Sequence, residues 1–238
     1  MIARSCHAAP AAARLGNRGT VAEQSLCYGG VMARPRVHDP DRVLDAVESL
    51  AARSGPAAVT IRAISEAAGV SNGALYHGFG SRAGLVGAAW LRAARRFLTV
   101  QAELVDTAPG PIDAVIAAAD APVTFAARHR DASRLLFAVR RDELLDADVP
   151  AELADQLRRT DTELTGLLIR LAAALWDRRD AAAVDTITTC VVDLPTAIVL
   201  SRNRLGSGTA RAQLHAAVRA VLTVGPPLRK DSPHEPEL

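Results

Sequence analysis

The stretch GVSNGALYHGFGSR, residues 69–82, interrupts a chain otherwise rich in alanine and leucine. It holds four glycines, a Tyr-His pair and a closing Arg, and it contains no acidic residue. Ser71 and Ser81 are both suited to cap the start of a helix, and Gly69 tolerates the positive φ of a tight turn. The stretch therefore predicts a turn, a very short helix from Ser71 to about His77, and a further helix that begins at Ser81.

A helix is also predicted just before this stretch. Thr60 suits its N-cap, Ile61, Ile64 and Ala68 would share one face, and Gly69 would end it. Two short helices joined across a three-residue turn form a helix-turn-helix. Such helices cross closely, so the residue near the crossing, Ser65, has to be small. The wedge between the helices is predicted to be filled by Ile64, Ala68, Val70 and Leu75.

The second helix of this pair has the features of a polyanion-binding element. The orphan N–H groups at a helix N-terminus and the helix dipole favour phosphate. Gly73 lies in the first turn, where a missing side chain lets the backbone come near a ligand. We therefore expect this helix to lie against the sugar-phosphate backbone of DNA.

The rest of the chain predicts an all-α protein. Apolar residues recur at helical spacing, and we find no internal repeat and no convincing strand. An N-terminal helix begins at Pro40, capped by Asp39, and is stopped by Gly55-Pro56, while the helix from Ser81 fades near Asp106. Later helices are predicted at about 112–129, 132–145, 150–177, 180–204 and 209–223.

Composition excludes several classes of protein. Of the 238 residues, 49% are hydrophobic and 3% aromatic, so a sizeable core is built from Ala, Leu and Val. No apolar run reaches the roughly 18 residues of a membrane helix, so we expect no membrane partner. Three scattered cysteines form no CxxC pair and six histidines form no HExxH-like cluster, which indicates a reduced, cytoplasmic setting and no metal or cofactor.

Charge is spread unevenly along the chain. Residues 32–98 carry nine Arg against five acidic residues, whereas residues 99–238 carry sixteen basic against twenty acidic residues. A basic segment on an acidic body is typical of a polyanion binder with a separate second role. Chance fluctuation is the alternative.

Residues 60–85, TIRAISEAAGVSNGALYHGFGSRAGL, resemble the DNA-binding domain of the tetracycline-repressor (TetR) family of bacterial transcription regulators. The specific part covers about 50 residues, and its core is AGVS-x-G-x-LY-x-x-F. The resemblance implies a helix-turn-helix domain at 32–80 and a helical ligand-binding and dimerisation domain at 81–224. Composition predicts disordered ends, since 1–31 has no sustained apolar period and 225–238 is rich in proline and charge. Alternatively, translation begins at Met32.

The resemblance also assigns roles to single positions. Thr60, Tyr76 and His77 resemble phosphate contacts, and Arg82 stands where the family usually has Lys facing phosphate. Arg62 resembles a position that reaches a base edge or a phosphate. The predicted DNA-binding residues are Thr60, Arg62, Ser71, Asn72, Gly73, Tyr76, His77 and Arg82, with Asn72 a candidate base reader. Ser65 and Gly78 depart from the residues that the family often has, which leaves the operator sequence open.

Dimerisation follows from the same resemblance, because two recognition helices must lie one DNA turn apart. The family's last two helices form a four-helix interface. The candidate interface residues here are Val184, Ile187, Val191, Leu194, Ile198, Leu214, Val218, Val221 and Leu222. The alternative is that this apolar stripe packs inside one subunit.

The remaining helices would enclose a pocket for a small-molecule effector of unknown identity. Its candidate walls are Leu104, Phe125, Phe137, Leu168, Leu171 and Trp176. Asp193 is a further candidate, since a carboxylate in so apolar a stretch is expensive to bury unless it is paired. It would either anchor a ligand or pair with an Arg across the dimer. Pro195 would kink the same helix.

The resemblance predicts a repressor that binds a palindromic operator as a homodimer and is released by a ligand. Two alternatives are an activator of the same family and a helical ligand-binding or interaction protein without specific DNA binding. An enzyme is disfavoured. GFGSRAG, residues 78–84, follows a helix rather than a strand and lacks the dinucleotide-binding spacing.

Arg34 and Arg36 flank Pro35 and form either a minor-groove arm or a solvated basic leader. If they form an arm, deletion of residues 32–37 will weaken DNA binding in a fluorescence anisotropy titration. Unchanged affinity would refute the arm and leave a solvated leader.

Overall fold

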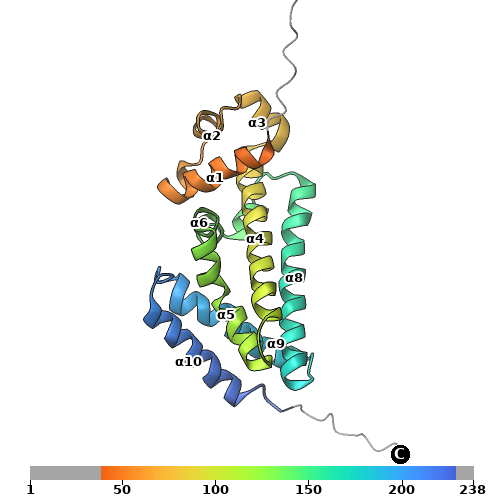
Figure 1. Cartoon of the computed structure of the whole chain (residues 1–238). Helices are drawn as coiled ribbons and strands as arrows, with labels where there is room; N and C mark the ends of the chain where they lie inside the picture. The colour runs from red at the N-terminus through yellow and green to blue at the C-terminus, as the bar shows by residue number, and fades with distance from the viewer. Residues whose placement is uncertain (1–38, 229–238) are drawn as a thin grey trace, which may run out of the picture. The chain divides into compact units, whose positions relative to one another are not determined.

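The computed structural model describes residues 39–228, and every regular element among them is a helix (Figure 1). The all-α prediction is confirmed. The predictions for 1–31, for Arg34 and Arg36, and for the tail after residue 228 lie outside the described residues. The elements are α1 (Pro40–Ser54), η1 (Pro56–Ala58), α2 (Ile61–Ala68), α3 (Asn72–Phe79), α4 (Arg82–Asp106), α5 (Pro111–Arg128), α6 (Arg130–Ala138), α7 (Arg141–Leu145), α8 (Ala151–Trp176), α9 (Ala181–Thr188), η2 (Thr189–Asp193), η3 (Thr196–Leu200) and α10 (Gly208–Val224).

The helices of the N-terminal half begin where capping residues stand in the sequence. The side chains of Thr60, Ser71 and Ser81 each accept a hydrogen bond from the backbone N–H three residues later. Each bond satisfies one of the donors that a helix start leaves unpaired. Gly55 and Gly69 follow α1 and α2 with φ of 81° and 66°, a region that glycine enters without a side-chain penalty.

One arginine ties α1 to α4. The guanidinium of Arg92 on α4 reaches Asp41 at 2.9 Å, Asp45 at 2.7 Å and Glu48 at 2.8 Å on α1. Its partial burial by itself would lower the pKa of Arg92, but hydrogen bonds and charge from the three carboxylates outweigh this and raise it. Glu48 is buried, so this cluster fixes α1 in one position on α4.

Two apolar cores form around α4 and α5. The first joins α1, α2, α3 and α4 to α6, α7 and α8, with Ile64, Leu75, Leu85 and Leu157 almost inaccessible to solvent. Because this core runs through both predicted domains, the helix-turn-helix packs directly on helices of the C-terminal part. The boundary at residues 80 and 81 stays a prediction.

The second core joins α5, α8, α9 and α10. At its edge lies Asp120 of α5, a buried carboxylate that is held by Arg211 and His215 of α10. Arg211 Nε donates to Asp120 Oδ1 at 2.7 Å, and His215 Nε2 lies 3.1 Å from the same oxygen. A buried charge needs such partners, so this group fixes α10 against α5.

Two predicted helices differ in the structure. The segment expected at 132–145 is split into α6 and α7 at Val139 and Arg140. The helix expected at 180–204 is α-helical only to Thr188 and then contains two π-helical segments, η2 and η3, up to Leu200. Pro195 lies between the two segments and has no N–H to donate within the helix.

The run Ala181–Leu200 corrects the expectation that no segment is long enough to cross a membrane. Its mean hydropathy of 1.6 over 20 residues meets that requirement by length and composition. In the fold, however, Ile187, Cys190, Val191 and Val199 of this run are buried in the second core. One face of the run thus packs in the second core, and 33% of its most apolar window is buried.

The first turns of α4 pack closely on their neighbours. A Cβ at Gly84 would overlap the carbonyl oxygen of Phe79, and a Cβ at Gly87 would lie 3.1 Å from a methyl carbon of Leu153 on α8. Ser81 also donates its hydroxyl to the carbonyl of Asp148 at 2.8 Å, just before α8. The recognition helix end, α4 and α8 thus meet at one junction, which Figure 1 shows between α3 and the upper ends of α4 and α8.

We expect Gly84→Ala to lower the free energy of unfolding by about 2 kcal/mol, because overpacking against a backbone carbonyl forces a shift. Gly166→Ala is the matched control. No atom lies within 4 Å of its added Cβ, and alanine should stabilise α8 by up to about 1 kcal/mol. Urea denaturation followed by circular dichroism measures both. Equal effects of the two variants would show that the junction is loosely packed.

Candidate nucleic-acid interface

The turn between α2 and α3 has the geometry that the sequence predicts. Gly69 is left-handed, with φ 66° and ψ 35°, and its N–H donates to the carbonyl of Ser65 at 2.9 Å. Ser65 Oγ donates to the carbonyl of Val70 at 2.6 Å. Ser65 is therefore more than a small residue at the crossing, because its hydroxyl bonds across the turn and holds α3 to α2. The predicted wedge residues Ile64, Ala68, Val70 and Leu75 are all buried.

The outward face of α3 is formed by Asn72, Gly73, Tyr76 and His77, all of them exposed. Their spacing of one, three and four residues places them on one side of the helix. Tyr76 leaves 52% of its surface accessible, which is unusual for so large a ring. Gly73 has no atom within 4 Å of an added Cβ. This glycine is thus not needed for packing and leaves the backbone open to an approaching partner.

The start of α2 presents a second set of groups. Thr60 is exposed and uses its hydroxyl to cap Ala63 N–H at 3.1 Å. Arg62 is also exposed and pairs with Glu66 at 2.9 Å, one turn along the helix. Exposed pairs of this kind contribute little to stability. A phosphate can therefore replace Glu66 as the partner of Arg62 at small cost.

Arg82 has a role in the structure that the sequence did not predict. Its Nε donates to the carbonyl of Val59, and its Nη2 donates to the carbonyl of Pro56 at 2.8 Å. The guanidinium thereby clamps the loop that leads into Thr60 and α2. Arg82 is exposed, so a remaining N–H can still meet a phosphate. Its phosphate contact stays a prediction, while the clamp is a positioning role.

Arg42 of α1 is a basic residue near this surface that sequence analysis missed. Its Nη2 lies 3.8 Å from the position of a Cβ on Gly69, so it stands over the turn. The two residues are far apart in the sequence, and only the packing of α1 on α2 brings them together. No acidic residue occurs between Glu66 and Glu103 in the sequence. Arg42 thus adds a positive charge beside the turn that leads into α3.

The predicted ligand walls belong to two apolar clusters, and their role as ligand walls stays a prediction. Leu104, Phe125 and Phe137 belong to a small aromatic cluster with Phe97, whereas Leu168, Leu171 and Trp176 belong to the second core. Asp193 is exposed in the single subunit, so its predicted pairing across a dimer or with a ligand stays a prediction. The six wall residues lie far apart along the chain, and sequence spacing gives no local signal of which of them share a cluster.

The predicted interface residues divide into two groups, as the alternative of packing inside one subunit allows. Five of them, Ile187, Val191, Leu214, Val218 and Leu222, are buried in the second core of the subunit itself. The inward face of each helix is the more apolar one, and the sequence pattern identifies that face first. Val184, Leu194, Ile198 and Val221 are partly accessible and keep the interface as a prediction.

No group of three or more His, Cys, Asp or Glu side chains between residues 39 and 228 could hold a metal ion. Within the same range, Cys190 is a buried free cysteine. Loss of hydration on burial raises the pKa of its thiol to about 11. Cys190 is therefore a protonated core residue at neutral pH and a poor nucleophile.

Comparisons with known proteins match this geometry. Residues 43–89 match a family model described as bacterial regulatory proteins, tetR family. A comparison with curated proteins found no match.

Solved structures share the fold of the described chain. A TetR-like transcriptional regulator from Rhodococcus sp. has 19% identity and a TM-score of 0.58, over 77% of this chain and 94% of that one. The ketosteroid transcriptional regulator KstR2 of Mycobacterium tuberculosis has 17% identity and a TM-score of 0.56, over 79% and 95%. FadR from Bacillus subtilis, in complex with stearoyl-CoA, has 14% identity and a TM-score of 0.56, over 78% and 98%.

The capped helix-turn-helix on a helical body defines the class as a DNA-binding transcriptional regulator. Residues 43–89 match the TetR family model, and the described chain shares the fold of solved structures named as regulators of that family. Proteins of this family are regulators rather than enzymes, and they bind DNA and small molecules, typically as dimers.

The clamp at Arg82 can be separated from a phosphate contact by Arg82→Lys. Lysine keeps the positive charge but cannot donate to two carbonyls in the fork geometry of arginine. We expect the variant to lose about 1 kcal/mol of unfolding free energy, close to the loss in Arg82→Ala, in urea denaturation. A lysine variant as stable as the parent would contradict the clamp and leave phosphate contact as the role of this position.

Proposed function

We propose that the protein is a ligand-responsive repressor that acts in the cytoplasm, binds a palindromic operator as a homodimer and is released by a small molecule. The observation that carries this proposal is the exposed face of α3, supported on a rigid turn. Asn72 and Gly73 lead the helix into the major groove, while Tyr76, His77 and Thr60 meet phosphates on either side. Arg62 and Arg82 add positive charge beside this face of α3.

The homodimer rests on the accessible face of the last helices. Along α10, Ala212, Ala216, Ala220 and Val224 are exposed and four residues apart, which places them on one side of the helix. Val224 leaves 86% of its surface accessible, an unusual exposure for valine. Small side chains allow a second copy of α10 to approach closely. We propose this face, together with Leu194 and Ile198, as the centre of a four-helix interface.

Release by a ligand requires an effector that favours a second conformation, in which the two recognition helices no longer match the operator. FadR from Bacillus subtilis holds stearoyl-CoA in a similar fold, which supports a small-molecule site in the helical body here. The helix that transmits this conformational change to the helix-turn-helix is α4, because it belongs to the first core and Arg92 holds it to α1.

The proposal predicts binding to DNA upstream of the protein's own coding region, measured by mobility shift across a salt series. Specific binding should weaken steeply with salt, because counterions are released from the phosphates. Tyr76→Phe removes only the hydroxyl and should weaken binding about fivefold. Asn72→Ala should lower discrimination between operator and random DNA.

Arg158→Gln is the matched control, since Arg158 lies on α8, is exposed and pairs only with Asp155 among the described residues. It removes one positive charge without touching α2 or α3, so operator affinity should stay unchanged. If the parent protein shows no preference for this DNA over random DNA at low salt, repression of its own promoter region is excluded. A helical ligand-binding protein then becomes the better explanation.

A further inference from the structure

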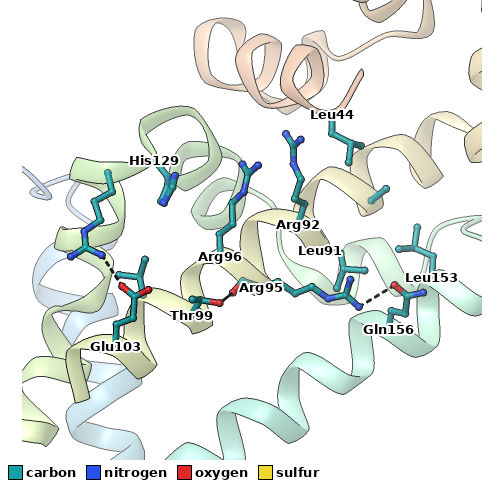
Figure 2. A pocket seen from close by; sticks show the side chains of 13 residues that line it. Leu44, Leu91, Arg92, Arg95, Arg96, Thr99, Glu103, His129, Leu153 and Gln156 are labelled. Carbon is teal, nitrogen blue, oxygen red and sulfur yellow. Dashed lines mark hydrogen bonds and ion pairs between the residues drawn. The ribbon is translucent and has the colours of Figure 1, made fainter. Parts of the chain in front are cut away.

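A groove of about 580 Å³ lies along α4, at the joint between the helix-turn-helix and the helical body. Its walls come from α1, α4, the junction of α5 and α6, and α8. Figure 2 shows Leu44, Leu91 and Leu153 at one end and Arg96, His129 and Glu103 toward the other. The volume lies within the range of small-molecule sites, which are mostly apolar with a few placed polar groups.

Four arginines line this groove, and the structure satisfies them to very different degrees. Arg92 is held by three carboxylates of α1, and Arg128 by Glu103 at 3.0 Å. Arg96 has one carboxylate partner, Glu48, at the long distance of 3.6 Å. Arg95 bonds to a neutral group, Gln156 Oε1, at 3.2 Å, and has no ion pair with any described residue.

Arg95 and Arg96 follow Arg92 after three and four residues, so each of them places a like charge next to Arg92 on α4. Such pairs destabilise a helix by a few tenths of a kcal/mol each. The α1 carboxylates offset this most at Arg92, more weakly at Arg96 and not at Arg95. Arg95 therefore provides positive charge that no carboxylate among the described residues balances, and the charge of Arg96 is balanced only at long distance. Figure 2 shows Arg95 directed toward α8 and Arg96 toward α1.

Beside these charges the groove is apolar. Leu44 of α1, Leu91 of α4 and Leu153 of α8 contribute side chains from three helices. A chain of methylene groups laid across them would bury apolar area from all three at once. The polar end of the groove and its apolar end are thus separated along α4.

We propose that this groove binds an elongated anionic amphiphile. Its carboxylate or phosphate head lies between Arg95 and Arg96, and its apolar tail lies on Leu44, Leu91 and Leu153. A carboxylate or phosphate makes stronger, charge-assisted bonds to arginine than the amide of Gln156 does. The head group accordingly displaces Gln156 from Arg95.

Because of the position of the groove, its occupant changes the affinity for DNA; this step rests on the repressor function proposed above. Gln156 and Leu153 lie in the first turns of α8. There the side chain of Leu153 lies close to Gly87 of α4. Ser81, the N-cap of α4 next to the end of α3, donates a hydrogen bond to Asp148 just before α8. An occupant that separates Gln156 from Arg95 and contacts Leu153 acts directly on this junction. The effector signal then travels through one packed contact to the recognition helix.

Binding is tested by isothermal titration calorimetry on the full chain, without DNA, below the micelle-forming concentrations of the probes. Octanoate, dodecanoate and hexadecanoate and the corresponding alkyl phosphates should bind. Dodecanol and dodecyltrimethylammonium, which lack the anionic head, should not. Acetate and inorganic phosphate, which lack the tail, should bind far more weakly. If one head type alone binds, that head is the one the site recognises.

Arg95→Gln combined with Arg96→Gln should weaken binding of the best probe at least about tenfold, because charge-assisted bonds are lost while side-chain size is kept. Arg158→Gln should bind like the parent. Leu91→Ala should weaken the long-tailed probes more than the short ones. The proposal is overturned if no anionic probe binds, if dodecanol binds as tightly as dodecanoate, or if the double variant binds like the parent.

The link to DNA is tested separately by operator titrations with and without the best probe. A loss of operator affinity that the double variant no longer shows supports the coupling. Probe binding with no effect on operator affinity overturns the coupling but leaves the site. Probe binding to a chain that binds no operator would instead contradict the repressor function.

Discussion

The fold depends on how closely α4 approaches its neighbours in its first two turns. Gly84 and Gly87 carry no side chain at the points where α4 meets the carbonyl of Phe79 and the side chain of Leu153. Any larger residue would separate the end of α3 from the start of α8. The helix-turn-helix is therefore joined to the helical body through backbone and apolar contacts rather than through a flexible linker. Arg92 and Arg82 complete this joint, since one holds α1 and the other holds the loop before α2.

The arginines between residues 62 and 96 differ in what lies opposite each guanidinium: groups that it fixes in place, one exposed carboxylate, or too few partners. Arg82 and Arg92 use their fork of donors to fix carbonyls and carboxylates of the protein itself, whereas Arg62 makes only an exposed pair. Arg95 and Arg96 remain incompletely satisfied. The basic balance of residues 32–98, read from the sequence as a sign of DNA binding, is thus divided between structure and recognition. Net charge over a segment cannot distinguish these tasks, because they differ only in which groups lie opposite each guanidinium.

Sequence reasoning succeeded where the determining chemistry is local. Caps at Thr60, Ser71 and Ser81, the left-handed Gly69 and the wedge around Leu75 all depend on residues within one or two turns, and all are confirmed. It failed where distant segments decide the outcome. The single helix expected at 180–204 instead contains two π-helical segments. Periodicity likewise identifies the inward face of α10 rather than the outward face with Ala216. The groove along α4 could not be predicted from the sequence, because it depends on contacts between four helices.

The glycines of α3 and α4 differ in the space around them, and this difference determines which positions can accept a larger side chain. Gly73 and Gly78 have open space around them, whereas Gly84 is closed in by a backbone carbonyl. Larger side chains can therefore be added on the outer surface of α3 without moving the helix. The surface of α3 that we propose contacts DNA can thus change while the packing of the helix on the protein stays the same. The proposed contact surface and the packing surface lie on opposite sides of one eight-residue helix, so single substitutions can alter the first without the second.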